Sequence, residues 1–214
     1  NPPWKEYAAA RKQYTVTGYQ TERSGNLYAM CIERSIALLR MAGRFSFIVQ
    51  LPLVSSSRMV TTRSLMTGHS ASLHIIPFDD RPGKLFDGLE HCRSSIFVLR
   101  RDGNIGSKVR ALAGYQRWFT EARSFLFDSL SYISGDVTSS PLDNFPKLAN
   151  SVHLAVLEKL WKHIGSTVEN VASGASGTHF IFYQEATQYW VKASIGYPYY
   201  AKNGVVGPQP HGRQ

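Results

Sequence analysis

The chain has 214 residues, of which 43% are apolar and 12% aromatic, so it can bury a sizeable core and is not an intrinsically disordered chain. Its 24 basic and 15 acidic side chains give a formal charge of +9, which favours an anionic partner, most often nucleic acid. The longest apolar run, residues 45–54, is interrupted by polar residues and is too short to span a membrane, so we expect no membrane partner.

The sequence opens with Asn1, Pro2, Pro3 and Trp4. Two prolines fix the backbone and remove two N–H donors, which leaves carbonyl oxygens, an amide side chain and an indole face in one rigid array. Such an array suits a planar base with an amino group, because the indole can stack on the ring while oxygens accept the amino hydrogens. A polyproline arm with a surface tryptophan is the alternative interpretation.

Asn26 predicts the N-cap of a helix over residues 27–41 that ends at Gly43. Apolar side chains recur at helical spacing and make a wide, buried face: Tyr28, Met30, Cys31, Ile32, Ile36, Leu38 and Leu39. Residues 45–49 then form a near-continuous apolar run, which is typical of a parallel strand covered on both faces.

Three further elements are expected before residue 103: a helix over 59–67 closed by Gly68, and strands over 73–78 and 94–99. The segment 84–93 joins the last two strands with little regular structure, so they could pair antiparallel. We predict that strand 45–49 runs parallel to strand 73–78, beside it or one strand removed, with helix 27–41 packed across the sheet.

Taken in order, NPPW, the helix and strand that follow, SLHIIPFDD and CRSSIFVLRR resemble the second half of an N6-adenine DNA methyltransferase. This family occurs in restriction-modification systems and in fused endonuclease-methyltransferase chains. The resemblance covers about the first hundred residues, and NPPW matches the catalytic motif. In the family this motif lies at the carboxyl end of a central parallel strand, where ligands gather in open α/β sheets.

The resemblance implies an α/β fold: the C-terminal half of a Rossmann-like, S-adenosylmethionine-dependent methyltransferase sheet over residues 1–102. It implies a connector over 103–150 and a partial α+β DNA-recognition region over 151–214. The implied reaction is methyl transfer from S-adenosylmethionine to N6 of an adenine flipped out of double-stranded DNA. The implied catalytic and DNA-contacting residues are Asn1, Pro2, Pro3 and Trp4, and Lys5, Arg100 and Arg101 respectively. Some family members bring a second aromatic residue to the base from the end of the last matched strand, where this chain has Arg100 and Arg101.

The family's glycine-rich cofactor loop lies upstream of the catalytic motif, and the glycine clusters at 103–108 and 173–177 do not replace it. We therefore expect a missing N-terminal half of the same polypeptide, and no methylation by this chain alone. Without the preceding strand, the NPPW segment is expected to be a short arm with little to fix its geometry.

Beyond residue 103, an aromatic-rich stretch over 115–130 is expected to pack in the core. Residues 151–163 predict an amphipathic helix with Val152, Val156, Leu157 and Leu160 inward and Lys159 and Lys162 outward. Residues 179–184 and 189–193 predict a pair of strands.

The remaining polar residues carry little signal for chemistry. Cys31 and Cys92 stand apart, which favours reduced thiols and a cytoplasmic protein, and the seven histidines lack metal-ligand spacing. Asp79 and Asp80 are interpreted as a turn. Two other functions stay open: a methyltransferase acting on a protein glutamine or an RNA guanine amino group, and an inactive DNA-binding remnant.

Overall fold

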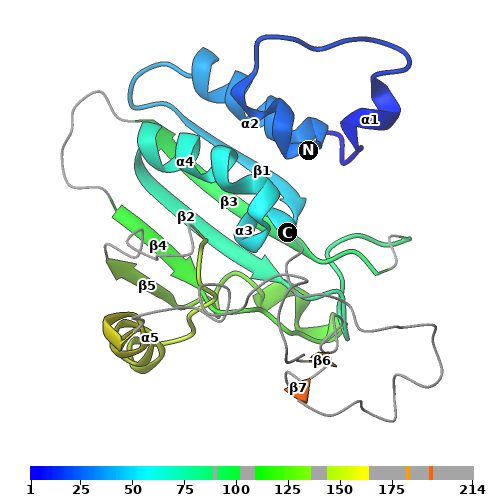
Figure 1. Ribbon diagram of the computed structural model, residues 1–214. Helices are drawn as coiled ribbons and strands as arrows, with labels where there is room; N and C mark the ends of the chain where they lie inside the picture. Colours follow the sequence, from blue (N-terminus) through cyan, green and yellow to red (C-terminus); the bar gives the residue numbers. More distant parts are fainter. Residues whose placement is uncertain (89–90, 102–108, 136–143, 164–181, 184–192, 195–214) are drawn as a thin grey trace. The chain divides into compact units, whose positions relative to one another are not determined.

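The computed structural model describes residues 1–88, 91–101, 109–135, 144–163, 182–183 and 193–194. The chain divides into two units, Asn1–Trp161 and Lys162–Gln214. The first unit is a mixed α/β fold built on a five-stranded mixed sheet (Figure 1).

Most helices of the first unit precede strand β2 (Ser70–Phe78) in the sequence. They are α1 (Tyr7–Ala10), η1 (Gln20–Ser24), α2 (Leu27–Leu38), α3 (Pro52–Ser55), η2 (Ser57–Met59), α4 (Val60–His69), η3 (Thr120–Phe125) and α5 (Ser151–His163), where η marks a 3-10 helix and the last two residues of α5 belong to the second unit. The strands are β1 (Arg44–Gln50), β2 (Ser70–Phe78), β3 (Ser94–Arg101), β4 (Val109–Ala113) and β5 (Tyr132–Gly135).

The strand order in the sheet is β1-β3-β2-β4-β5. β3 pairs antiparallel with both β1 and β2, so β1 and β2 run in the same direction with one strand between them. This confirms the predicted relation of these two strands and the antiparallel pairing of β2 with β3. β4 pairs parallel with β2, and β5 pairs antiparallel with β4.

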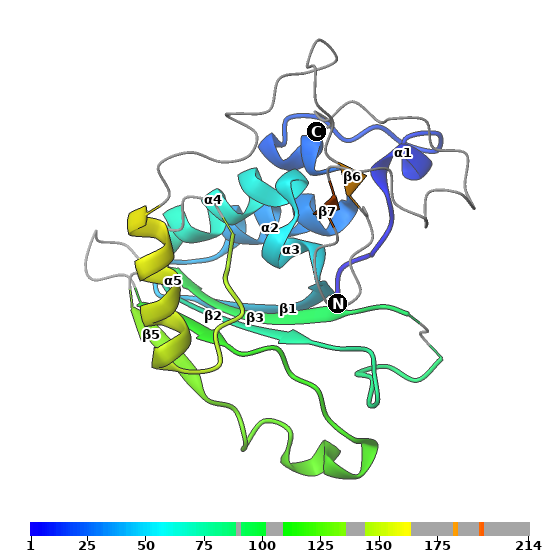
Figure 2. The same cartoon turned by 60° about the horizontal axis from the view of Figure 1, so that its bottom comes forward.

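Helix α2 packs across the sheet as predicted, together with α3 and α4 on the same face (Figure 2). The Asn26 side chain accepts a hydrogen bond from the backbone N–H of Tyr28 and so caps the helix. The helix ends at Leu38, three residues earlier than predicted, because the backbone is already extended at Leu39. Leu38 is consequently 68% exposed and does not belong to the buried face.

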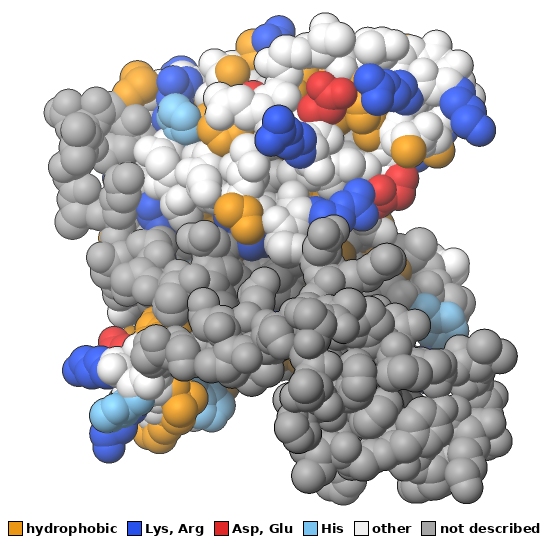
Figure 3. Space-filling model, viewed as in Figure 1, with side chains coloured by type: hydrophobic (Ala, Val, Ile, Leu, Met, Phe, Trp, Pro, Cys, Tyr) orange, Lys and Arg blue, Asp and Glu red, His pale blue; other side chains and the backbone are white. Residues whose placement is uncertain are grey.

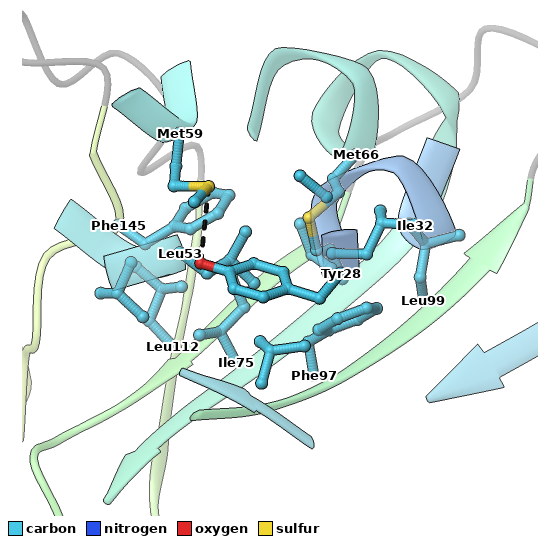
Figure 4. Packing of buried hydrophobic residues seen from close by; sticks show 14 of the residues in the cluster. Tyr28, Ile32, Leu53, Met59, Met66, Ile75, Phe97, Leu99, Leu112 and Phe145 are labelled. Atoms are coloured by element: carbon cyan, nitrogen blue, oxygen red, sulfur yellow. Dashed lines mark hydrogen bonds between the residues drawn. The ribbon is translucent and has the colours of Figure 1, made fainter. Parts of the chain in front are cut away.

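The main core lies between these helices and one face of the sheet. Tyr28 and Ile32 of α2 contact Phe97 and Leu99 of β3, and the Tyr28 hydroxyl lies 3.5 Å from the Met59 sulfur (Figure 4). Alternate residues of the strands point to the other face, where Ile76, Phe78 and Ile96 form a second, smaller cluster with Trp118 and Leu126. Both clusters follow from the two-residue period of a strand.

β1 differs from the prediction of a strand covered on both faces. Among its seven residues only Val49 is buried. The reason is its position, because β1 is the end strand of the described sheet and has no described neighbour beyond it. Helix α4 also differs slightly, since it runs through Gly68 instead of ending there.

The segment expected as a connector, 103–150, contributes β4 and β5 to the sheet. The aromatic-rich stretch within it is only partly in the core: Trp118 and Leu126 are buried, whereas Phe119 and Phe125 are exposed. The glycine cluster at 103–108 lies outside the described residues.

Helix α5 has the predicted bounds, and its inward face is confirmed only in part. Leu157 packs against the core as predicted, together with Leu154, and Lys159 and Lys162 are exposed. Val152, Val156 and Leu160 were predicted to face inward but are each more than half exposed. In the second unit, β6 (Phe182–Tyr183) and β7 (Ala193–Ser194) pair antiparallel, in line with the predicted strand pair. The rest of that pair and the glycine cluster at 173–177 lie outside the described residues.

Candidate functional site

The NPPW segment lies along the open edge of β1. The hydrogen bonds from Arg101 N to Gly43 O and from Leu51 N to Arg93 O show that odd-numbered residues of β1 face β3. The carbonyl of Ile48 therefore points away from β3, and it accepts a hydrogen bond from the Trp4 indole nitrogen at 3.1 Å. The first residues of the chain are thus placed beside the carboxyl end of β1.

A second set of contacts fixes the chain directly after Trp4. Leu27 N donates to Lys5 O at 3.0 Å, and Tyr7 N donates to Gly25 O at 2.8 Å. Glu6 between them forms an ion pair with Arg58 at 2.7 Å. The expectation of a loosely held arm is therefore wrong, because backbone bonds to the start of α2 and the indole bond to β1 hold it from both sides.

One open pocket of about 440 Å³ adjoins this segment. It is lined by Asn1, Pro2, Trp4, Phe86, Asp87 and Gly88, and we call it the aromatic pocket. The Phe86 and Trp4 rings meet edge to face, with centroids 5.7 Å apart and planes at 75°. Its volume lies within the range usual for small-molecule pockets.

Phe86 is the residue of the site that sequence analysis missed. It belongs to the loop that joins β2 to β3. Because β3 runs opposite to β1 and β2, this loop lies at the carboxyl ends of those two strands. The available signal was an aromatic residue in the turn of a predicted antiparallel pair. The place expected for a second aromatic, at Arg100 and Arg101, lies at the other end of β3.

Arg100 and Arg101 lie far from Trp4. Arg100 pairs with Arg44 at the amino end of β1, four residues along the strand from Ile48 or about 13 Å. Arg100 is exposed, whereas the half-buried Arg101 donates hydrogen bonds to the carbonyl oxygens of Ile36 and Leu39 at the end of α2. Arg101 thus caps a helix.

The other predicted residues are distributed as follows. Pro2 is buried, Trp4 is half-buried, and Asn1, Pro3 and Lys5 are exposed. Lys5 directly follows Trp4, which lines the aromatic pocket. On the face seen in Figure 3, the described lysines and arginines lie apart from one another, in line with the even spread of basic residues in the sequence.

A second open pocket of about 500 Å³ also borders Asn1 and Pro2, on the side of α2. Its lining is mainly aromatic and aliphatic, with Asn1, Cys31, Arg34 and Ser35 as polar members, and none of the described residues that line it is acidic. The NPPW segment therefore has open space on two sides.

Charged groups gather at the carboxyl end of β2. Burial works to raise the pKa of the Asp79 carboxyl, but hydrogen bonds from the Asp80 backbone and from Tyr115 and Arg93 hold it below its ordinary value. Arg93 Nε lies 3.1 Å from Asp79 and 3.4 Å from Asp80, and Arg117 Nε lies 3.3 Å from Asp79. The backbone N–H of Asp80 bonds its neighbour's carboxylate, which agrees with the predicted turn.

Because Asp79 and Arg93 stand at opposite ends of the β2–β3 connection, their ion pair closes the loop that carries Phe86. Burial is also the main cause that raises the pKa of Tyr115, and the adjacent Asp79 raises it further.

Within the described part of the chain there is no cluster of three metal-ligating side chains. The helices of that part include none long and apolar enough to cross a membrane.

No protein-family model matches the sequence, and no curated protein does. The fold has counterparts among solved structures. A nuclease-deletion mutant of the Type ISP restriction-modification enzyme LlaGI, in complex with a DNA substrate mimic, superposes with a TM-score of 0.52 and 12% identity. That match covers 72% of this chain and 18% of that one.

Two other matches are weaker in shape. The DrdV–DNA complex gives a TM-score of 0.46 at 13% identity, over 63% of this chain and 16% of that one. The ATP-dependent Type ISP enzyme LlaBIII bound to DNA gives 0.40 at 14%, over 54% and 10%. The chain thus spans less than a fifth of each of these proteins. What the LlaGI match shows is a shared fold over part of a much longer enzyme.

Proposed function

We propose that this chain forms the acceptor side of a site-specific DNA methyltransferase of a restriction-modification system, which methylates N6 of an adenine flipped out of duplex DNA. The observation that carries the proposal is the aromatic pocket. In it, Asn1, Pro2 and Trp4 meet Phe86, a residue 82 positions from Trp4 in the sequence.

The pocket offers what an extrahelical adenine needs. Trp4 and Phe86 supply aromatic surface on which the base can stack. The Asn1 side-chain oxygen and the Pro2 carbonyl oxygen are acceptors for the two hydrogens of the N6 amino group. When the methyl carbon passes from the donor sulfur to N6, N6 would become positive; the same two oxygens would stabilise that charge, and one N6 proton would then leave to water.

The methyl donor, S-adenosylmethionine, supplies an electrophilic methyl group when bound. The described residues do not fit this cofactor, because the pocket beside α2 has no acidic lining to bind a ribose and Asp87 of the aromatic pocket is exposed. We therefore assign cofactor binding to residues other than those that line these two pockets, and assign to the aromatic pocket the holding of the acceptor base.

Two further points support this substrate class. The charge of +9 suits a polyanion, and LlaGI, which shares the fold, was solved with a DNA substrate mimic. A glutamine amide has no ring to stack, so the contact between Trp4 and Phe86 favours a base over a protein side chain. The experiment below distinguishes adenine from guanine as the bound base.

A single-stranded probe tests the pocket without a recognition sequence, because an unpaired base needs no flipping. Fluorescently labelled oligothymidine with one central adenine is compared with the same strand carrying guanine, unsubstituted purine or an abasic residue. We expect the 214-residue chain to bind the adenine strand about 3- to 10-fold more tightly than the purine strand, which lacks the amino group.

Trp4→Ala should remove the preference for adenine and leave the affinity for the abasic strand unchanged. Phe119→Leu is the matched control, since Phe119 is an exposed aromatic that does not line the pocket. Equal affinity for the adenine and abasic strands would contradict the proposal. Tighter binding of the guanine strand would favour the alternative in which a guanine amino group is the acceptor.

A further inference from the structure

The loop that carries Phe86 is fastened by an arginine from a distant helix. Arg123, in η3, donates hydrogen bonds from Nη1 to the carbonyl of Lys84 at 3.1 Å and from Nη2 to the carbonyl of Leu85 at 3.0 Å. These are the two peptide groups immediately before Phe86. Arg123 itself does not line the aromatic pocket.

The same side chain is held in place from behind. Its guanidinium lies over the Trp118 ring, 5.7 Å from the centroid, and Trp118 is buried in the second hydrophobic cluster. The backbone carbonyl of Trp118 accepts a hydrogen bond from Gly83 N at 2.7 Å. A Cβ at Gly83 would lie only 2.7 Å from that oxygen, so the loop and the segment before η3 are in close contact.

We infer that Arg123 is a positioning residue of the proposed base-binding site and acts through Phe86. A planar guanidinium that bonds two successive carbonyls restricts the backbone rotation between them, and so fixes the direction in which the Phe86 side chain leaves the chain. The result is the edge-to-face contact with Trp4. A lysine cannot reproduce this bidentate geometry.

A purely structural role for Arg123 makes different predictions. Arg123 is exposed, and exposed polar contacts contribute little to global stability. A structural role therefore predicts at most a small change in unfolding and no change in the ring contact. The positioning role predicts loss of the ring contact while the fold stays intact.

The test uses the 214-residue chain with Arg123→Ala, Arg123→Lys and, as matched control, Arg11→Ala. Arg11 also lies 5.7 Å over an aromatic ring, that of Tyr7, but has no hydrogen bond to the Phe86 loop. The first readout is the nuclear Overhauser effect between the Trp4 and Phe86 rings without any ligand. We expect it to be lost in Arg123→Ala, weakened in Arg123→Lys and kept in Arg11→Ala.

The second readout rests on the proposed function. Arg123→Ala should weaken binding of the adenine strand about 3- to 10-fold more than binding of the abasic strand, and should add no adenine-specific loss in a chain that already carries Phe86→Leu. A retained ring contact in Arg123→Ala, or additive effects of the two substitutions, would overturn the inference. If the wild-type chain shows no preference for adenine, the proposed function fails, while the ring contact still decides the role of Arg123.

Discussion

The two ends of the sheet place the candidate site residues in different surroundings. At the carboxyl end of β1 and β2, Trp4 donates an indole hydrogen bond to β1, Arg123 holds the two carbonyls just before Phe86, and both aromatic rings line one pocket. At the amino end of β1, Arg101 is engaged in capping α2, and Arg100 faces Arg44 on the neighbouring strand. The candidate site is therefore distinguished from the rest of the surface by side chains that converge on one pocket, more than by its charge.

The largest effect is expected at Asn1. In an enzyme that joins this sequence to a cofactor-binding region, Asn1→Ala should slow methylation about 10²- to 10³-fold, because one acceptor for the developing charge on N6 is removed. DNA affinity should change little, since phosphate contacts dominate it. Single-turnover transfer of a tritiated methyl group measures the rate, and a wild-type rate would rule out the role.

Phe86 sharpens the contrast between the two ends of the sheet. Phe86→Ala should weaken binding of the adenine strand about 10-fold or more, because base-aromatic stacking contributes roughly 1–3 kcal/mol per base. Arg100→Ala at the far end should reduce the affinity for every strand by the same small factor. Fluorescence anisotropy checks both; a larger adenine-specific loss in Arg100→Ala would reverse the assignment of the two ends.

Arg101 should affect stability and not the pocket. Arg101→Ala leaves the last carbonyls of α2 without their charged donor, and we expect it to lower the free energy of unfolding by about 1.5–3 kcal/mol. Arg100→Ala, as its neighbour control, should stay within about 0.5 kcal/mol of wild type. Urea denaturation measures both, and an unchanged Arg101→Ala variant would return Arg101 to the candidate DNA contacts.

The smallest effect expected is the pH dependence contributed by Asp79. Its pKa is lowered in the folded chain, so its contribution to stability is complete well above the ordinary value of 3.8 and is lost as the pH falls below it. Asp79→Asn should therefore be less stable than wild type by about 1 kcal/mol at neutral pH, and the difference should shrink in acid. Urea denaturation between neutral pH and pH 3 measures it, and a pH-independent difference would contradict this origin.

The local pattern of apolar residues was sufficient to predict the elements that bury a regularly spaced apolar face. The helical spacing of Tyr28, Ile32 and Ile36 and the apolar runs of β2 and β3 predicted both the elements and their packing. β4 escaped notice because its five residues include an arginine. Arg110 is only 2% exposed, and its guanidinium bonds the carbonyl of Thr67 at 2.6 Å, which the sequence alone does not indicate.

Part of the candidate site could likewise be predicted from local sequence, and part could not. The NPPW string could be identified from its own residues, since rigidity and acceptors follow from prolines and an amide. Phe86 and Arg123 could not, because their roles depend on the direction of β3 and on contacts between residues 38 or more positions apart. The same strand direction placed Arg100 and Arg101 at the far end of the sheet.

The most direct test of the central claim is whether an adenine base lies against Trp4. The four tryptophans give four indole N–H resonances, which single substitutions to Phe assign. On addition of the adenine strand, we predict a shift of the Trp4 resonance that the abasic strand does not cause, with the buried Trp118 unchanged. An adenine-dependent shift at Trp161 or Trp190 with Trp4 unaffected would contradict the account.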